Sequence, residues 1–526
     1  MRVVNRVLKL CSSSSSSSCS TVTELTRNLS TLLHNFTSIT TNPEPISNKY
    51  RTRSRSRSPL KGRRKPSKAA TCLCHSLGVL NNIEDGSVDR VLNEWISTQG
   101  KSFNKDDILV SVDYLRSRNK FNHALQLLEW TEKRSLIWLS NREHAIYIVL
   151  LGKTRGVEAA EKYFAELPES AKRKSTYGSL LHCYCFKKMT EKAIVLCEKM
   201  KALNFPLNSF DYSSLMTLHM KLGQPDKVAL VMKEMKEKGI KQHIYNYKLL
   251  INSYASLNDI NAVEKVEEEI KTVRSIVPDW NFFCNLSAIY IAAGFLEKAE
   301  LNLKNVEKLK LYDSRPFHFL LNLYASIGKP EEVYRVWQSL KSAFPKTSNL
   351  SYLTMLQVLS RLEDMEGLKR CFEEWEPHCL SDDVRLPNVL IKAYLKRDMI
   401  EEAKLLLDRT LKKGCEPNFA TYVLFIDFFV KIHDMDLALN YMRVGTSYVK
   451  NPERKMYIEY VSMFQKYCEE RNDVDGAEEF MTLMQDAVSL DPVVRDIDAS
   501  LRDEVDTFSA KRLSKLFHYG TISDDH

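Results

Sequence analysis

The chain has 526 residues, 44% hydrophobic content and a formal net charge of +9, enough sequence for several ordinary domains or for one extended array. Its twelve cysteines form no paired Cys-x-x-Cys sets of the kind that bind zinc, and no run of about eighteen apolar residues predicts a membrane span. Residues 1–70 hold fourteen Lys or Arg against two Glu, a net +12, which leaves residues 71–526 at −3.

Residues 1–40 have the composition of an organellar transit peptide. Arg2, Arg6 and Lys9 are set among serines and aliphatic residues, and the first acidic residue is Glu24. Leaders that are rich in Arg and Ser and poor in acidic residues direct proteins to mitochondria or plastids. Basic and aliphatic residues alternate over residues 2–8, which predicts an amphipathic helix and favours the mitochondrion over the plastid. A disordered tail without function is the alternative.

Residues 41–105 are predicted to be a basic Ser/Arg-rich linker followed by a short helical lead-in. The Arg-Ser alternation at 51–58 and the basic run at 61–68 are too polar to bury and are expected to be disordered. Such alternation can bind RNA or act as a nuclear signal. A plain linker, or a continuation of the leader, is the favoured explanation.

From residue 106 to residue 484 the sequence is periodic. An aromatic residue recurs every 34 to 36 residues, with Pro387 in the one vacant slot, and a small or aliphatic residue follows each slot by sixteen residues. The aromatic slots are Tyr177, Tyr212, Tyr247, Phe283, Phe317, Tyr352 and Tyr422. The second register is Ala193, Val228, Val263, Ala299, Val333, Leu368, Ala403 and Ala438. A fixed period in this range is typical of stacked helical hairpins.

Each period is predicted to form two helices. Tyr177, Leu180, Leu181 and Tyr184 fall at i, i+3, i+4 and i+7, which is one stripe of an α-helix. A break follows at a shared position, where glycine permits a left-handed helix end: Gly223, Gly294 and Gly328. The second helix then carries the Ala193-type residue. No segment alternates with period two, so the sequence predicts an all-α protein.

The predicted architecture is an α-solenoid, a superhelix of about eleven tandem helix-turn-helix repeats of about 35 residues. The array spans 106–484, with approximate units at 106–140, 141–173, 174–208, 209–243, 244–279, 280–313, 314–348, 349–383, 384–418, 419–453 and 458–492. Residues 485–526 are predicted to be a C-terminal tail. The scattered cysteines are expected to be reduced packing residues.

The unit 174–208, with Tyr177 at its fourth position, Ala193 at its twentieth and Met200 at its twenty-seventh, resembles the pentatricopeptide repeat of plant organellar RNA-binding proteins. Units 209–243 and 384–418 are similar to it. The tetratricopeptide repeat shares both registers but needs small residues where its helices cross. Here the eighth position is large, as in Leu181 and Met216, which favours the pentatricopeptide repeat.

The resemblance implies that one RNA base is recognised per repeat, by the residue after the aromatic slot together with the last residue of the repeat. We call each such couple a reading pair. The pairs are Gly178 with Asn208, Ser213 with His243, Lys248 with Asp279, Cys284 with Asp313, His318 with Ser348, Leu353 with Asp383, and Asn388 with Asn418. Asn388 with Asn418 is an orthodox combination that implies a pyrimidine, and Gly178 with Asn208 leans towards adenine. The other pairs depart from the family pattern, and Asp or Asn at a repeat end is also an ordinary turn residue.

No catalytic or metal-binding motif is predicted. Gly152, Lys153 and Thr154 are like the end of a P-loop, but the earlier glycine is replaced by Tyr147. Cys183 and Cys185 would point in different directions on a helix, which favours packing over a metal site. The tail lacks the ligands of the zinc deaminase domain that some relatives carry, so the resemblance is to the P class of plain repeats.

Two functions remain open. The first is an RNA-binding adaptor for single-stranded organellar RNA, which acts without a cofactor in transcript stability, processing, editing or translation. The second is a structural subunit of the mitochondrial ribosome, which contacts protein and ribosomal RNA without reading bases. The net charge of −3 on residues 71–526 does not favour sequence-independent electrostatic binding of RNA along the whole array. A local basic stripe, with contributions from the run 221–241, remains open beside a solvated helix face.

Overall fold

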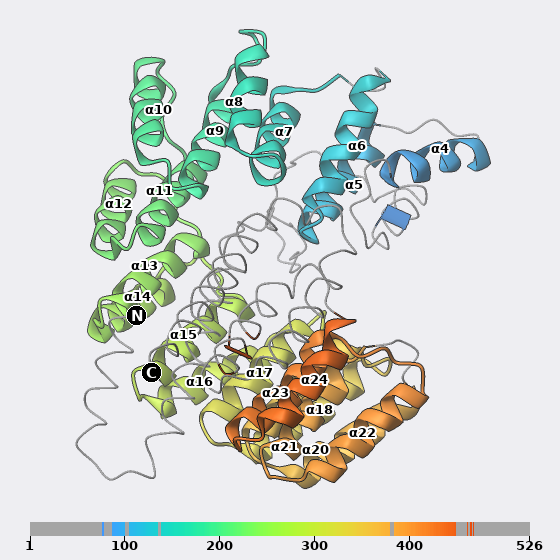
Figure 1. The fold of residues 1–526 in the computed structure, drawn as a ribbon. Coiled ribbons are helices and arrows are strands. Elements are labelled where there is room, and N and C mark those ends of the chain that lie inside the picture. Colours follow the sequence, from blue (N-terminus) through green and yellow to red (C-terminus); the bar gives the residue numbers. More distant parts are fainter. Residues whose placement is uncertain are drawn as a thin grey trace, which may run out of the picture. The chain divides into compact units, whose positions relative to one another are not determined.

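The computed structural model describes residues 76–77, 87–99, 105–134, 138–378 and 383–448, together with residues 460, 463, 464 and 467. Its elements in these ranges are twenty-one α-helices, labelled α4 to α24, and one short 3₁₀ turn, with no strand (Figure 1). The predicted all-α class is therefore confirmed. The predicted leader, nearly all of the linker, the tail and almost all of the unit 458–492 lie outside the described residues.

The chain divides into two compact units, Met1–Leu311 and Tyr312–His526. In the first unit a lead-in helix is followed by six helix pairs. The helices are α4 (Ser87–Gln99), α5 (Lys105–Ser117), α6 (Phe121–Lys133), α7 (Asn141–Thr154), α8 (Val157–Glu166), α9 (Lys174–Phe186), α10 (Thr190–Ala202), α11 (Ser209–Lys221), α12 (Pro225–Glu237), α13 (Ile244–Ser256), α14 (Ile260–Thr272), α15 (Trp280–Ala292) and α16 (Leu296–Glu307).

The second unit holds four helix pairs within the described residues. They are α17 (Arg315–Ser326), α18 (Pro330–Ala343), α19 (Asn349–Arg361), α20 (Met365–Trp375), α21 (Arg385–Leu395), α22 (Ile400–Lys412), α23 (Phe419–Lys431) and α24 (Met435–Thr446), with the 3₁₀ turn η2 at Glu376–His378. Odd-numbered helices from α5 onwards are the first helices of their pairs, and even-numbered helices are the second.

The two sequence registers form the core of both units. Tyr177, Leu180, Leu181 and Tyr184 are all buried on α9, as their helical spacing predicts. Every residue of the Ala193-type register is fully buried or nearly so. Phe283 departs from the pattern because it is only partly buried. Its neighbour Phe282 is buried, as is the residue before the aromatic slot in other units, for example Asp211.

The tyrosines at the aromatic slots also carry a polar contact. The hydroxyls of Tyr212, Tyr247 and Tyr352 donate to Glu234 (3.2 Å), Glu269 (2.7 Å) and Glu374 (3.0 Å) on the second helix of the same pair. A buried tyrosine needs such a partner for its hydroxyl. In these three pairs the aromatic residue therefore both fills the core and connects the two helices.

The turns between paired helices have the predicted left-handed residue. Gly223 and Gly328 adopt φ values of 70° and 72° at the shared position. Asn258 and His433 occupy this position in other repeats and adopt the same conformation, with φ values of 60° and 62°. Glycine is therefore favoured at this position without being required.

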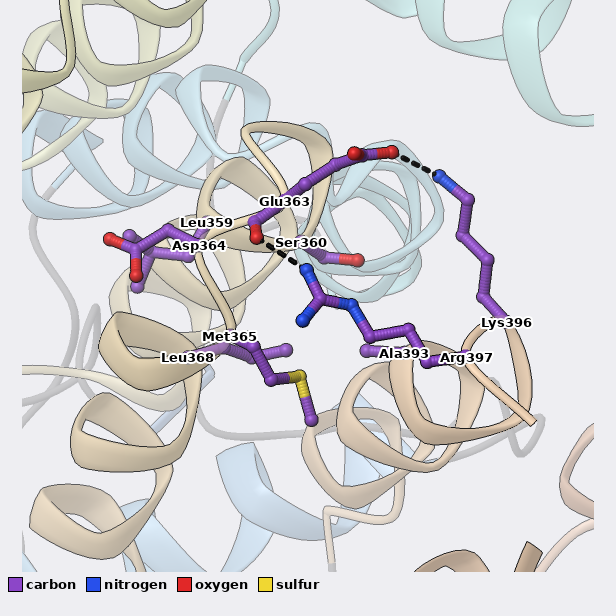
Figure 2. Close-up of a pocket in the computed structure, with 9 residues that line it drawn as sticks. All are labelled: Leu359, Ser360, Glu363, Asp364, Met365, Leu368, Ala393, Lys396 and Arg397. Carbon is purple, nitrogen blue, oxygen red and sulfur yellow. Dashed lines mark hydrogen bonds and ion pairs between the residues drawn. The ribbon is translucent and has the colours of Figure 1, made fainter. Parts of the chain in front are cut away.

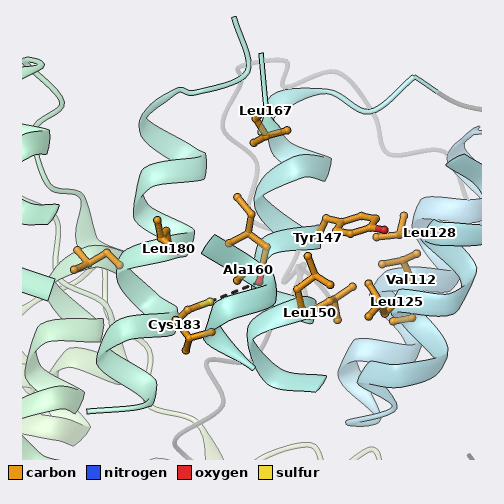
Figure 3. Close-up of a cluster of buried hydrophobic side chains, with 14 of the residues drawn as sticks. Val112, Leu125, Leu128, Tyr147, Leu150, Ala160, Leu167, Leu180 and Cys183 are labelled. Carbon is orange, nitrogen blue, oxygen red and sulfur yellow. Dashed lines mark hydrogen bonds between the residues drawn. The ribbon is translucent and has the colours of Figure 1, made fainter. Parts of the chain in front are cut away.

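Stacking is local, as expected of a solenoid. Each first helix packs on its own second helix and on the next first helix, in the series α7, α9, α11, α13, α15 and in the series α17, α19, α21, α23. Figure 3 shows the continuity in the first unit, where Leu128, Tyr147, Ala160 and Leu180 connect α6, α7, α8 and α9. The predicted helical solenoid is thus observed in each unit. Among the described helices, none combines the length and the hydropathy needed to cross a bilayer.

Candidate nucleic-acid interface

The predicted reading pairs lie along the row of first helices. Their first members are on α9, α11, α13, α15, α17, α19 and α21, in the order Gly178, Ser213, Lys248, Cys284, His318, Leu353 and Asn388. Their second members lie at the starts of the following first helices. Because consecutive first helices within each unit pack side by side, the two members of a pair that lies within one unit belong to neighbouring helices. The pair Cys284 with Asp313 has one member in each unit.

The second members of the pairs act at helix N-termini. Asn208 Oδ1 accepts from the backbone N–H groups of Phe210 (2.8 Å) and Asp211 (3.2 Å). Asp279, Ser348 and Asn418 cap α15, α19 and α23 in the same way. Asp313 and Asp383 instead hold Arg315 and Arg385 two residues later, at 2.8 Å and 2.7 Å. Helix capping thus accounts for four of these polar residues, and an ion pair with the following arginine accounts for Asp313 and Asp383.

The first members of the pairs are mostly engaged by the next helix. Ser213 Oγ accepts from Asn246 Nδ2 (2.8 Å) and donates to the Ser209 carbonyl (2.7 Å). Lys248 Nζ donates to Asn281 Oδ1. His318 Nε2 lies 2.9 Å from Ser351 Oγ.

Three of the remaining first members lack a polar group that faces solvent. Gly178 has no side chain, and the Asp211 carboxylate lies where its Cβ would stand. Cys284 is fully buried, and burial raises the pKa of its thiol. Lys248 and Asp279 both lie close enough to that thiol to affect its pKa. Leu353 is apolar and buried. Asn388 on α21 has a side-chain oxygen, Oδ1, that is buried and has no hydrogen-bond partner among the described residues, and the same holds for Asp211 Oδ1 beside Gly178.

A group of basic side chains occupies the C-terminal ends of α7, α9 and α11. Lys221 Nζ lies 3.7 Å from the centre of the Phe186 ring and donates to the Phe186 carbonyl (3.0 Å). Lys153 Nζ lies 5.8 Å from the same ring and 4.2 Å from the Phe121 ring. Lys187 and Lys188 follow directly and are exposed. We call Lys153, Phe186, Lys187, Lys188 and Lys221 the basic cluster.

The positive charges of the basic cluster oppose one another. Burial and the neighbouring Arg116 and Lys221 lower the pKa of Lys153 to about 8. Burial and the neighbouring Lys188 and Lys187 lower the pKa of Lys221 to about 8. An anion bound here would relieve that repulsion, so the site fits a phosphate group placed beside an aromatic ring.

The same repeat position is basic in the second unit, and there the partners of the side chains include a carboxylate. Arg361 donates to the Asn322 carbonyl (3.1 Å) and is largely buried, which lowers its pKa. Lys396 forms an ion pair with Glu363 (2.8 Å). Figure 2 shows this pair at the rim of a small pocket, where Arg397 also reaches the Glu363 carbonyl (2.7 Å). The charges lining this pocket therefore satisfy one another.

The basic run at 221–241 divides between two environments. Only Lys221 joins the basic cluster. Lys233, Lys236 and Lys238 lie on or just after α12 and pair with acidic residues, at 2.6 Å for both Lys236 with Glu269 and Lys238 with Glu234. That part of the run is a solvated helix face. The basic cluster itself was missed, although its signal is simple: Phe186 and Lys221 each follow an aromatic slot by nine residues.

The other motifs are structural. Lys153 and Thr154 end α7, so the P-loop-like segment lies inside a helix. His182 packs on Phe210 with the ring centres 5.0 Å apart, and burial followed by Lys153 and Lys221 lowers its pKa to about 3. Cys183 and Cys185 are buried free thiols, as predicted, and burial raises their pKa values. Within the described ranges, no group of three His, Cys, Asp or Glu is placed to hold a metal ion.

Comparison with known proteins identifies the family. A mitochondrial pentatricopeptide repeat-containing protein of Arabidopsis thaliana is 40% identical to this chain over 414 residues, which cover 78% of this chain and 77% of the relative. A second such protein is 40% identical over 75% of this chain and 78% of its own length. The chain belongs to the pentatricopeptide repeat family. The resemblance inferred from its aromatic period is thereby confirmed, and the mitochondrial location of these relatives supports the predicted address.

Further matches to the pentatricopeptide repeat family cover the same region. The family model of the pentatricopeptide repeat domain matches residues 195–256 and 230–279, and that of the PPR repeat matches 175–205 and 387–415. Large ribosomal subunit protein mL101 of A. thaliana is 37% identical over 76% of this chain and 81% of its own length. The crystal structure of maize PPR10 with an 18-nucleotide psaJ RNA element has a TM-score of 0.48 and 17% identity, and covers 79% of this chain and 60% of that one.

Proposed function

We propose that the protein is a mitochondrial adaptor that binds single-stranded RNA and acts in post-transcriptional RNA metabolism, in transcript stability, processing, editing or translation. It is a P-class member that works by binding alone, without a catalytic residue, a cofactor or a small-molecule substrate. Its partners are single-stranded organellar RNA and other RNA-processing proteins that act on the same RNA.

The observation that carries this proposal is the basic cluster. Lys153 and Lys221 are drawn into partly buried positions beside Phe186, where their charges repel each other and those of Arg116, Lys187 and Lys188. Phosphate contacts from lysine combined with aromatic side chains are the usual means of holding single-stranded nucleic acid. The cluster is local, which reconciles phosphate binding with the net −3 of residues 71–526.

Binding of the full-length chain to labelled RNA tests the proposal. The probes are a mixed-sequence single strand of about 20 nucleotides and the same strand annealed to its complement, at about 0.15 M salt. We expect the single strand to bind at least about tenfold more tightly, since a duplex hides its bases from aromatic side chains. No affinity for the single strand, or equal affinity for the duplex, would refute the proposal.

A second candidate function is a structural place in the mitochondrial ribosome. Two observations favour it: the similarity to Large ribosomal subunit protein mL101, and the engagement of most reading-pair residues within the protein. In that role the chain contacts protein and ribosomal RNA without reading bases. Gradient sedimentation of the tagged protein from mitochondria separates the two functions, because only a ribosomal subunit stays with the large particle after extensive RNase-free washing at high salt.

A further inference from the structure

Lys221 is held against the protein without a carboxylate partner. It is the last residue of α11, and its Nζ lies 3.7 Å from the centre of the Phe186 ring and donates to the Phe186 carbonyl (3.0 Å). Among the described residues, no carboxylate forms an ion pair with it. Lys201 on α10 differs, because it pairs with Glu198 at 2.8 Å and this hydrogen bond raises its pKa. The ammonium form of Lys221 lacks that stabilisation.

The groups around Lys221 instead favour its neutral form. Burial and the neighbouring Lys188 and Lys187 lower the pKa of Lys221 to about 8, and the buried Cys185 thiol opposes them only in part. A lysine that is partly desolvated beside other cations is an activated nucleophile. At pH 8, about half of the Lys221 side chains are therefore free amines, against less than about 1% of ordinary lysines.

Exposed cations lie next to this amine. Lys187 and Lys188 directly follow α9, and their charges are among the causes that lower the pKa of Lys221. For Lys153, the other partly buried lysine of the basic cluster, the corresponding neighbours are Arg116 and Lys221. A phosphate that is drawn to Lys187 and Lys188 therefore comes to lie beside Lys221, whether it belongs to RNA or to a small phosphorylated molecule.

We propose that Lys221 is a modification site that accepts an acyl group from a thioester on a phosphorylated carrier, and that this acylation switches off phosphate binding by the basic cluster. Lys187 and Lys188 bind the phosphates of the carrier, and the amine of Lys221 takes the acyl group. The effect on RNA rests on the proposed RNA-binding function, whereas the modification itself does not.

The transfer needs no oxidant and no further reactant. The lone pair of the neutral Lys221 amine attacks the carbonyl carbon of the thioester, so that an N–C bond forms and the C–S bond breaks. The proton that leaves the nitrogen ends on the departing sulfur, and the products are an amide and a free thiol. The hydrogen bond to the Phe186 carbonyl uses one N–H group, which the amide retains.

Acylation changes the site in two ways. It removes the charge of Lys221 and the attraction of that charge to the Phe186 ring. The modified protein should therefore bind single-stranded RNA about tenfold more weakly. Since RNA and the acyl donor use the same cations, bound RNA should also protect Lys221 from acylation.

Incubation of the full-length chain with acetyl-coenzyme A at pH 8, followed by peptide mass spectrometry, tests the modification. We expect Lys221 to be acetylated at least about tenfold faster than Lys201, an advantage smaller than the ratio of free amines because a less basic amine is a weaker nucleophile. S-acetyl-N-acetylcysteamine, a thioester without phosphates, should show a smaller preference for Lys221. Equal rates at Lys221 and Lys201 would overturn the inference, and an equal preference with both donors would overturn its phosphate step.

Lys221→Arg tests the consequence for RNA. Arginine does not accept the acyl group under these conditions, so treatment with acetyl-coenzyme A should leave the RNA affinity of this variant at its starting value. The wild type and the matched control Lys201→Arg should both lose about tenfold on treatment. An equal loss in Lys221→Arg would overturn the switch. If Lys221 is acetylated selectively but the untreated chain binds no single-stranded RNA, the proposed function has failed; the modification site then stands, and only the switch falls.

Discussion

The two units carry basic side chains at the same repeat position in different surroundings. In the first unit, Lys153 and Lys221 lie beside Phe186, and burial together with neighbouring cations lowers their pKa values. In the second unit, Arg361 is bound to Asn322 and Lys396 to the carboxylate of Glu363. A place in the repeat therefore does not assign a phosphate contact by itself, because the neighbouring repeats decide whether cations or a carboxylate surround the charge.

The reading pairs do not distinguish the two units. Ser213 accepts from Asn246 in the first unit, and His318 Nε2 lies 2.9 Å from Ser351 Oγ in the second. We infer that the basic cluster of the first unit contributes the phosphate contacts.

The largest expected effect is loss of RNA affinity on removal of the basic cluster. The double variant Lys153→Gln with Lys221→Gln should weaken binding of single-stranded RNA by on the order of 100-fold, because each charged hydrogen bond contributes about 1.5–3 kcal/mol. Fluorescence anisotropy measures the change.

The matched control for that variant is Lys201→Gln with Lys271→Gln. These lysines are exposed, lie on the second helices α10 and α14, and pair locally with Glu198 and Glu268. The control removes the same charge and should change affinity less than about threefold. A similar loss in both double variants would mean that net charge alone drives binding.

The next effect is a dependence of RNA affinity on pH. In the free protein Lys153 and Lys221 lose their protons near pH 8, whereas a bound phosphate favours the protonated forms. Affinity should therefore fall as pH rises from 7 to 9, by up to about tenfold for each lysine. The variant with both lysines replaced by Gln should lose this dependence, and an equally steep profile in that variant would contradict the assignment.

A third effect concerns the stability of the first unit at Asp211, whose carboxylate is buried beside Gly178. Burial raises the pKa of Asp211 to about 6, above its value in the unfolded chain, so the ionised group opposes folding above that pH. Asp211→Asn should therefore raise stability at pH 7, by about 1–3 kcal/mol, and lose this advantage near pH 4. Urea unfolding of the wild type and the variant at both pH values measures this difference in the free energy of unfolding. A variant that is less stable at pH 7 would show that the charge is needed.

The smallest expected effect comes from Lys396, which lies in the second unit at the repeat position that Lys153 and Lys221 occupy in the first. Lys396→Gln should change RNA affinity less than about twofold, since the side chain is already paired with Glu363 and exposed. A loss comparable to that of Lys153→Gln alone would mean that the two units contribute equally to phosphate binding.

The scaffold could be predicted from the sequence because it follows from periodicity. The aromatic slots and the Ala193-type register fixed the helix pairs, and the glycine turns have the expected conformation. Phe283 shows the limit of this approach: it occupies an aromatic slot, yet it is only partly buried, which its place in the period does not predict.

The interface could be predicted only in part, because it depends on contacts between repeats. The sequence places Ser213 at a reading position, but nothing in its own repeat shows that Asn246, more than thirty residues later, binds its hydroxyl. The basic cluster likewise joins Lys153, Phe186 and Lys221 from three repeats. The run at 221–241 suggests a basic stripe because its lysines are close in sequence, yet Lys233, Lys236 and Lys238 form ion pairs with acidic residues.

The most direct test of phosphate binding by the first unit is the salt dependence of RNA affinity. For single strands, the logarithm of the binding constant falls with the logarithm of salt by about 0.7 per phosphate contact. The variant with Lys153→Gln and Lys221→Gln should therefore show a slope smaller than that of the wild type by about 1.4. An unchanged slope would contradict the central claim that these two lysines hold the RNA backbone.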